Sequence, residues 1–229
     1  MPTINPDQQT PIELKDASAI IFDLDGVLLE SEQVWSAAKR EFSIERGGIW
    51  TAAAERDMLG MSSPEWSRYM RDALSLPLDP AAISGSVVEL VASRYRESLP
   101  LIAGADAAVR TLTERYRLGL ASSSNRQTID LVLDLAGWAS RFDATTSSEE
   151  VAAGKPAPDV YLETARRLGG SVLSSVAVED SDVGIRSAAA AGLIVVAIPN
   201  RAYPPAAEAL GLADLLLDSI SELLGAIIG

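Results

Sequence analysis

Short apolar runs recur along the chain, and each one leads into a polar or turn-forming stretch. The first run is Ala19–Phe22, and comparable runs follow at Tyr116–Ala121, Ser175–Val178 and Ile194–Ile198. Continuous apolar runs of this length that end at a turn signal are typical of strands buried on both faces. We therefore predict a strand at each run and take Asp214–Leu217 as a further candidate strand.

Helical patterns separate several of these runs. One follows a typical helix start at Pro158-Asp159, and another ends at Gly137. Their apolar faces consist of Val160, Tyr161, Thr164, Ala165 and Leu168, and of Ile129, Val132, Leu133 and Ala136. Alternating strands and helices predict an α/β fold, with a Rossmann-like, mostly parallel sheet flanked by helices. Ligands of such sheets bind at the carboxyl ends of the strands.

The segment from residue 30 to residue 101 breaks this alternation, because it shows helical patterns only. Its longest amphipathic stripe consists of Ile83, Val87, Leu90, Val91 and Tyr95, and Pro100 and Gly104 mark its end. We predict that residues 30–101 form an inserted, all-helical cap domain. The α/β core then comprises residues 18–29 and 102–229, and residues 1–17 form a flexible leader.

The composition excludes several kinds of catalysis. The 229-residue chain is 48% hydrophobic, which allows a sizeable core, and it has no cysteine and no histidine. Disulfides, thiolate zinc sites, cysteine nucleophiles, the Ser-His-Asp triad and imidazole bases are therefore excluded. Catalysis must use carboxylates, hydroxyls, lysine, arginine or tyrosine, together with a hard metal ion held by oxygen atoms.

Charge and hydropathy also limit the partners. Lys and Arg total 19 against 32 Asp and Glu, and the formal net charge of −13 argues against nucleic acid and anionic membranes as partners. Residues 1–17 lack the basic start and apolar core of a signal peptide, and no apolar run approaches the length of a membrane span. We expect a cytoplasmic monomer or homodimer.

Two carboxylates, Asp23 and Asp25, follow the first apolar run, and a turn at Gly26 comes after them. Like charges held this close repel one another, so we expect one carboxylate to bind a cation and the other to hold a proton. This is the local chemistry of metal-assisted phosphoryl transfer.

Three further motifs follow later strands. Ser122-Ser123-Ser124-Asn125 offers hydroxyls and backbone N–H groups to a phosphoryl group beside a helix N-terminus. Lys155 presents one cation from a loop that contains Gly154 and is stiffened by two prolines, and Glu179-Asp180 adds two carboxylates. Mg²⁺ prefers oxygen ligands and keeps several waters, so a few carboxylates and a substrate oxygen suffice for it.

This ordered set, from Ile20 to about Asn200, resembles the haloacid dehalogenase superfamily of aspartate-nucleophile phosphohydrolases. Asp23-Leu24-Asp25-Gly26-Val27 is similar to its first motif, Ser122 to its second, Lys155 to its third and Glu179-Asp180 to its fourth. The helical insertion resembles the cap of the phosphoglycolate phosphatase and β-phosphoglucomutase branch. The resemblance implies a Mg²⁺-dependent hydrolase of small phosphorylated metabolites.

The resemblance also implies a role for each site residue. Asp23 attacks the phosphorus, and Asp25 protonates the leaving alcohol and then deprotonates the attacking water. Ser122 and Lys155 stabilise the charge on the phosphoryl oxygens. The further residues implied are Ser123, Asn125 and Gly26 around the phosphate, and Asp23, Asp25 (through its carbonyl), Glu179 and Asp180 around Mg²⁺.

Less specific roles compete at several positions. Ser123 and Ser124 suit an ordinary turn equally well, and helix capping competes with metal binding at Asp180, although Asp182 is the better predicted cap, with Val183 and Ile185 facing the core behind it. We expect Asn200-Arg201 in an exposed loop. In the insertion, packing roles are expected for Trp50, Trp66, Tyr69 and Tyr95, with cover of the site by one of the tryptophans as the alternative. A solvated helix face is expected for Arg68 and Arg71, with contact to a second charged group of the substrate as the alternative.

Two positions depart from the pattern of the branch. Trp35 stands where relatives often carry a histidine, and Ser63 stands where β-phosphoglucomutases carry an arginine. A mutase must rebind its intermediate and exclude water, so both replacements favour hydrolysis over mutase chemistry. A non-catalytic phosphometabolite-binding protein is a second alternative. A dehalogenase is disfavoured, because the dehalogenases of this superfamily lack an aspartate at the position of Asp25.

Overall fold

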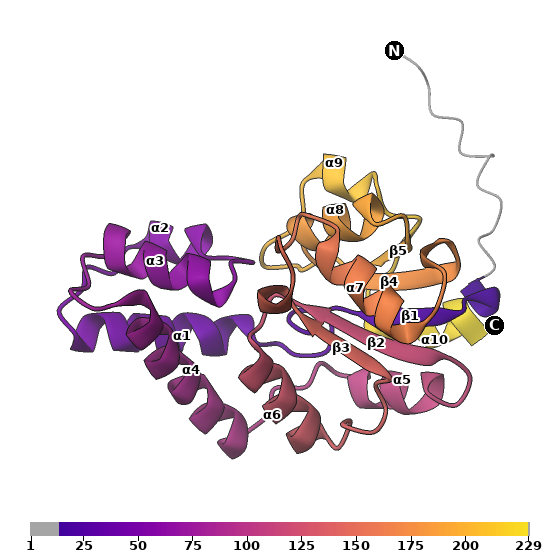
Figure 1. Cartoon of the computed structure of the whole chain (residues 1–229), viewed down its shortest axis with the longest axis horizontal. Helices are drawn as coiled ribbons and strands as arrows, with labels where there is room; N and C mark the ends of the chain where they lie inside the picture. Colours follow the sequence, from indigo (N-terminus) through magenta and orange to yellow (C-terminus); the bar gives the residue numbers. More distant parts are fainter. Residues whose placement is uncertain (1–13, 229) are drawn as a thin grey trace, which may run out of the picture.

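A computed structural model describes residues 14–228, which form a parallel sheet sandwiched by helices, with a group of helices beside it (Figure 1). All strand pairs in the sheet are parallel, in the order β3-β2-β1-β4-β5-β6. The strands are β1 (Ala19–Phe22), β2 (Arg117–Ser122), β3 (Ala144–Ser147), β4 (Ser175–Glu179), β5 (Ile194–Ala197) and β6 (Leu215–Leu216). The predicted α/β fold is confirmed.

Successive side chains of the central strand enter two different cores, as the two-residue period of a strand requires. Ile20 and Phe22 pack into the larger core, whereas Ala19 and Ile21 pack into the smaller one on the opposite face. Because both faces are covered, all residues of β1 are buried, which explains why the sequence of this strand is apolar throughout.

Helices cover the two faces of the sheet (Figure 1). The larger core contains residues of α5 (Ala105–Leu112), α6 (Arg126–Ala136) and α10 (Ile220–Ile228), and the smaller core contains residues of α7 (Asp159–Leu168), α8 (Asp182–Ala190) and α9 (Ala207–Leu210). Short 3₁₀ turns occupy η2 (Leu14–Asp16), η3 (Ser148–Glu150) and η4 (Val172–Ser174).

The first four of the five helices between β1 and β2 form what we call the helical insert. They are α1 (Glu32–Glu45), α2 (Ala52–Asp57), α3 (Ser63–Ala73) and α4 (Pro80–Glu97). A capping box joins Ser62 and Glu65 at the start of α3, and the Asp79 carboxylate caps α4 ahead of Pro80. These local signals explain where both helices begin.

The chain enters and leaves the helical insert along two adjacent segments. The Glu30 amide donates to the Pro100 carbonyl at 2.9 Å, and the Ile102 amide donates to the Leu28 carbonyl at 3.0 Å. These bonds pair the two connections where the insert joins the sheet. The helical insert is therefore tied to the carboxyl end of β1.

The structure differs from the sequence expectations in two places. β3 was not predicted, because its sequence, Ala-Thr-Thr-Ser, has no apolar run; its β-branched threonines suit an edge strand. Of the expected leader, Leu14–Asp16 form η2 with Leu14 buried, and residues 1–13 lie outside the described part of the chain. Across residues 14–228, no helix has the length and apolar character that a bilayer crossing requires.

Candidate active site

The carboxyl ends of β1 and β4 bring two of the predicted acids side by side. Phe22 pairs with Val178 in the parallel register, and the Asp23 amide donates to the Val178 carbonyl at 3.0 Å. Asp23 and Glu179 are therefore neighbours at one edge of the sheet. The parallel register explains this placement, because it aligns the residue that follows Phe22 in β1 with the residue that follows Val178 in β4.

Lys155 joins these two acids. Its Nζ lies 2.7 Å from Asp23 Oδ1 and 2.6 Å from Glu179 Oε1, and its side chain is only 2% exposed. Burial alone would lower the pKa of Lys155, but the two carboxylates raise it above its ordinary value. The lysine is therefore a permanent cation at the base of the site, on the loop that precedes α7.

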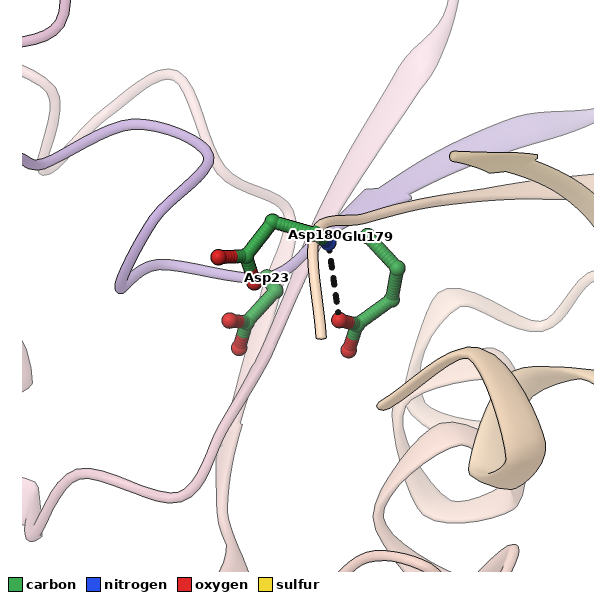
Figure 2. Close-up of side chains that lie close together, drawn as sticks. All are labelled: Asp23, Glu179 and Asp180. Carbon is green, nitrogen blue, oxygen red and sulfur yellow. Dashed lines mark hydrogen bonds between the residues drawn. The ribbon is translucent and has the colours of Figure 1, made fainter. Parts of the chain in front are cut away.

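Three buried carboxylates face this single cation. Oxygen atoms of Asp23, Glu179 and Asp180 all lie within 4.8 Å of one another, and Figure 2 shows the three side chains lying close together. Burial raises the pKa of Asp23 to about 7, because the opposing effect of Lys155 is offset by Glu179 and Asp25. Burial, Glu179 and Asp23 likewise raise the pKa of Asp180.

This charge imbalance fits a divalent cation. A hard metal ion beside Asp23 and Asp180 would remove the carboxylate repulsion and lower both pKa values. Glu179 fits direct metal binding less well, because hydrogen bonds already occupy both of its oxygens. Lys155 and the Tyr161 hydroxyl, each at 2.6 Å, donate to Oε1, and the Asp180 amide at 3.1 Å and the Ser181 hydroxyl at 3.2 Å donate to Oε2.

Hydroxyl groups hold the Asp25 carboxylate. Ser31 donates to Oδ1 at 2.5 Å, and Ser124 donates to Oδ2 at 2.8 Å, with Ser122 farther away at 3.4 Å. Ser31 precedes α1 of the helical insert, whereas Ser122 and Ser124 belong to the end of β2 and its loop. Asp25 is half-buried, so its carboxyl group is oriented by three donors and still reaches the cavity.

Gly26 lets the backbone pass directly against Asp180. Its φ is +84°, in the left-handed region, and a Cβ at this position would lie 1.9 Å from Asp180 Oδ2. Any larger residue would displace that carboxylate as well as strain the turn. Glycine is required here because the Asp180 carboxylate occupies the space of a side chain.

A cavity of about 820 Å³ opens over these residues, between the sheet and the helical insert. Asp23, Asp25, Ser123, Lys155 and Asp180 line it from the core. Trp35, Lys39, Ser63 and Trp66 line it from the helical insert. A volume of this size accommodates a small organic ligand.

The sequence profile of the haloacid dehalogenase-like hydrolases matches residues 17–192. The chain belongs to this family. It is 34% identical to hexitol phosphatase B of Escherichia coli K12 over 90% of this chain and 93% of that protein. It is 30% identical to the fructose-1-phosphate phosphatase of the same organism, over 78% of this chain and 95% of the relative.

A solved structure has a similar fold over nearly the whole chain. CbbY from Rhodobacter sphaeroides, in complex with xylulose-(1,5)bisphosphate, superposes with a TM-score of 0.80 at 28% identity, over 92% of this chain and 99% of that chain. The family membership and the phosphatase relatives confirm the prediction that this chain is a phosphatase-type hydrolase.

In this haloacid dehalogenase-like hydrolase, two predicted phosphate-binding residues have structural partners. Ser122 is fully buried, and its Oγ accepts from the Ser124 amide at 3.0 Å. The Asn125 Oδ1 accepts from the Thr128 amide at 2.8 Å, which caps α6, while its Nδ2 faces the Ser63 hydroxyl of the helical insert at 3.4 Å. Asn125 thus links the start of α6 to the helical insert.

Two local expectations were wrong. Ser181, not Asp182, caps α8, because its extended backbone lets its hydroxyl accept from the Gly184 amide; Asp182 is the first helical residue and pairs with Arg186. Val183 is only half-buried and lines the cavity instead of facing the core.

Asn200 also differs from the exposed loop that we expected. It is half-buried, and its Nδ2 donates to Asp180 Oδ2 at 3.2 Å, so it orients the Asp180 carboxylate. Arg201 is exposed, as predicted. Arg68 and Arg71 are exposed on α3, outside the cavity lining, as a solvated helix face requires.

Sequence reasoning missed Tyr161, Ser31 and Lys39. Tyr161 is part of a predicted apolar stripe, and nothing in that stripe indicated that its hydroxyl contacts Glu179. Ser31 stands in the linker into the helical insert, and its contact with Asp25 depends on a turn. Trp66 was expected to pack, and it does so at 2% exposure while also lining the cavity.

Proposed function

We propose that this enzyme is a Mg²⁺-dependent phosphohydrolase of small organic phosphomonoesters, sugar phosphates above all, which acts through an aspartyl phosphate on Asp23. The observation that carries the proposal is the Asp23 carboxylate itself. Its Oδ1 is held by Lys155, its Oδ2 has no hydrogen-bond partner within residues 14–228, and the side chain lines the cavity. One oxygen is thus fixed while the other is available for attack.

Asp23, Asp180 and the Asp25 carbonyl would hold the metal ion, which when bound neutralises charge on the transferring phosphoryl group. We assign Glu179 to a different task from the direct ligation first expected. Its four hydrogen bonds fix Lys155 and the turn that carries Asp180. The backbone at Gly26 leaves room for the Asp180 carboxylate.

The chain supplies each step of the reaction. Asp23 Oδ2 attacks the phosphorus, and the bond from phosphorus to the alcohol oxygen breaks as Asp25 delivers a proton to that oxygen. Asp25 then takes a proton from the water that attacks the aspartyl phosphate, which releases phosphate and restores Asp23. Ser31 and Ser124 orient Asp25 for both transfers.

The remaining predicted residues surround the phosphoryl group in this proposal. Lys155 supplies the fixed positive charge against its oxygens, and Ser122, Ser123 and Asn125 supply donors at the start of α6. The helical insert acts as a cap that limits the entry of water. A cavity enclosed on two sides suits small esters better than folded phosphoproteins.

Hydrolysis is favoured over mutase chemistry by the cap side of the cavity. Trp35 and Ser63 line it at the positions where the mutase resemblance implies histidine and arginine. Neither residue offers the imidazole or guanidinium group that helps a mutase to retain its phosphorylated intermediate. A purely phosphate-binding protein would not need Asp25 held by serine hydroxyls in the cavity.

The experiment is phosphate release from a panel of phosphomonoesters with Mg²⁺ and with chelator. We expect Mg²⁺-dependent release from one or more small sugar or sugar-alcohol phosphates, and no release by Asp23→Asn. Release that survives chelation, or equal release by Asp23→Asn, would contradict the proposal. Conversion of a sugar phosphate into its isomer without phosphate release would instead support the mutase.

A further inference from the structure

Lys39 is a buried cation in the cavity wall that the proposed reaction does not use. It lies on α1, two turns after Glu32, and is 6% exposed. The chain has three lysines, and the other buried one, Lys155, has two carboxylate partners. Within residues 14–228, no acceptor forms a hydrogen bond or ion pair with the Lys39 ammonium.

Aromatic rings surround this ammonium group instead. Nζ lies 5.7 Å from the ring centroid of Trp35 and 5.3 Å from that of Trp66, and the two rings are 6.1 Å apart. Cation–π contacts stabilise the charge but accept no conventional hydrogen bond, so the three ammonium donors have no acceptor in the described part of the chain. All three side chains line the cavity that contains Asp23.

Helix periodicity explains this arrangement. Glu32, Trp35 and Lys39 follow one another at three- and four-residue spacing, which places them on one face of α1. That face is turned to the cavity, and α3 adds Trp66 from the side. Glu32 and Asp25 are the charged groups that act on Lys39 from a distance.

The electrostatics keep Lys39 charged at neutral pH. Burial lowers its pKa to about 8, and Glu32 and Asp25 oppose this shift. A buried cation without a hydrogen-bond acceptor is costly, and an anionic ligand would recover that cost. A neutral hydroxyl group of a ligand would recover much less of this cost.

We propose that Lys39, with Trp35 and Trp66, forms a subsite for a second anionic group of the substrate, a carboxylate or a second phosphate, in the same cavity as the reacting phosphoryl group. This inference rests on the proposed function and narrows its substrate class. It makes Lys39 a specificity-determining residue, because it contacts the substrate away from the reacting atoms.

The test compares esters in matched pairs. 6-Phosphogluconate is compared with glucose 6-phosphate, and fructose 1,6-bisphosphate with fructose 6-phosphate, by kcat/KM in the Mg²⁺-loaded enzyme. We expect the more anionic member of at least one pair to be preferred by about tenfold or more, the size of a hydrogen bond to a charged group. Which pair shows the preference distinguishes a carboxylate from a second phosphate.

Substitutions assign the preference to Lys39. Lys39→Met keeps the length and apolar stem of the side chain, and we expect it to remove the preference while changing kcat/KM for the less anionic ester less than threefold. Lys39→Arg should retain the preference. Arg40→Met is the control, because Arg40 is the next residue on α1 but is exposed and outside this cavity.

No preference in either pair, or an equal loss for both members in Lys39→Met, would overturn the inference while leaving the phosphatase intact. If no ester is hydrolysed, the proposed function fails, and binding to Asp23→Asn decides the inference alone. Calorimetry should then show tighter binding of the more anionic member in at least one of the two pairs, and the Asp23→Asn/Lys39→Met double variant should bind both members of that pair equally. Equal binding within both pairs before the Lys39 change would overturn the inference.

Discussion

Lys155 and Asp23 are 132 positions apart in the sequence, and their side chains form an ion pair of 2.7 Å with exposures of 2% and 8%. Each buried charge depends on the other. Lys155→Met would leave two carboxylates, those of Asp23 and Glu179, without their cation. Removing one partner of a buried ion pair costs about 3–5 kcal/mol, because the remaining charge stays desolvated.

We therefore expect Lys155→Met to lower the free energy of unfolding by about that amount and to abolish phosphate release, as measured by urea denaturation and by turnover. Arg166→Met is the control, because the Arg166 side chain is 71% exposed beside Glu163. It should leave both quantities unchanged. An equally stable Lys155→Met would show that this ion pair does not hold the site together.

Gly26 and Gly47 have nearly the same backbone conformation but different surroundings, which makes them a matched pair. Their φ values are +84° and +78°, but a Cβ would meet Asp180 at Gly26 and nothing within 4 Å at Gly47. We expect Gly26→Ala to lower kcat/KM by at least a hundredfold and to weaken the Mg²⁺ dependence. Gly47→Ala should cost only about 1 kcal/mol of stability from strain and leave activity intact. Equal activities in the two variants would contradict the tight approach.

Tyr161→Phe tests the support of Glu179. The change removes one buried hydroxyl donor at 2.6 Å and leaves Lys155 on the same oxygen. We expect a loss of about 1–3 kcal/mol in the free energy of unfolding, with kcat reduced less than tenfold, because Asp23 keeps its own contact with Lys155. Tyr116→Phe, whose hydroxyl bonds the Lys15 carbonyl at an exposed site, is the control. A complete loss of activity in Tyr161→Phe would instead place this hydroxyl in the reaction.

The charge of Lys39 gives a pH dependence with a defined sign. Its pKa falls from 10.5 to about 8 on folding, so above pH 8 the folded protein loses this proton while the unfolded chain retains it. The preference for the more anionic ester should therefore decline above about pH 8, whereas Lys39→Arg should keep it to pH 9.5 or beyond.

The same lowering of the Lys39 pKa makes the folded protein more stable as the pH rises. Because the unfolded chain binds the extra proton between pH 8 and 10.5, the contribution of Lys39 to the free energy of unfolding rises across that window. Urea denaturation should show the wild type gaining stability relative to Lys39→Met as the pH rises. A constant difference would mean that Lys39 does not titrate in the folded protein.

Much of the fold was predictable because its signals are local. β1 was predicted with its observed bounds, since both of its faces are buried and its sequence is therefore apolar throughout. β2 begins and ends one residue later than predicted, and β5 and β6 are slightly shorter than predicted, because hydrogen bonding rather than hydropathy sets strand ends. β3 was not predicted, because its polar sequence contains no apolar run.

The functional site was likewise predictable only in part. Asp23, Asp25 and Gly26 were predicted from an apolar strand that ends in acids and a glycine. The contacts of Tyr161, Asn200 and Lys39 were not, because each depends on how separate elements pack and not on its own neighbours in sequence. Their roles become visible only when distances to Glu179, Asp180 and the two tryptophans are known.

The most direct test of the account is to locate the covalent phosphate. The best ester found in the panel is incubated with the Mg²⁺-loaded enzyme, the reaction is quenched with acid, and the acyl phosphate is reduced with borohydride before peptide mapping by mass spectrometry. We predict homoserine at position 23, dependent on substrate and absent in Asp23→Asn. Reduction at another aspartate, or efficient turnover without any modified residue under conditions that trap a known aspartyl phosphatase, would contradict it.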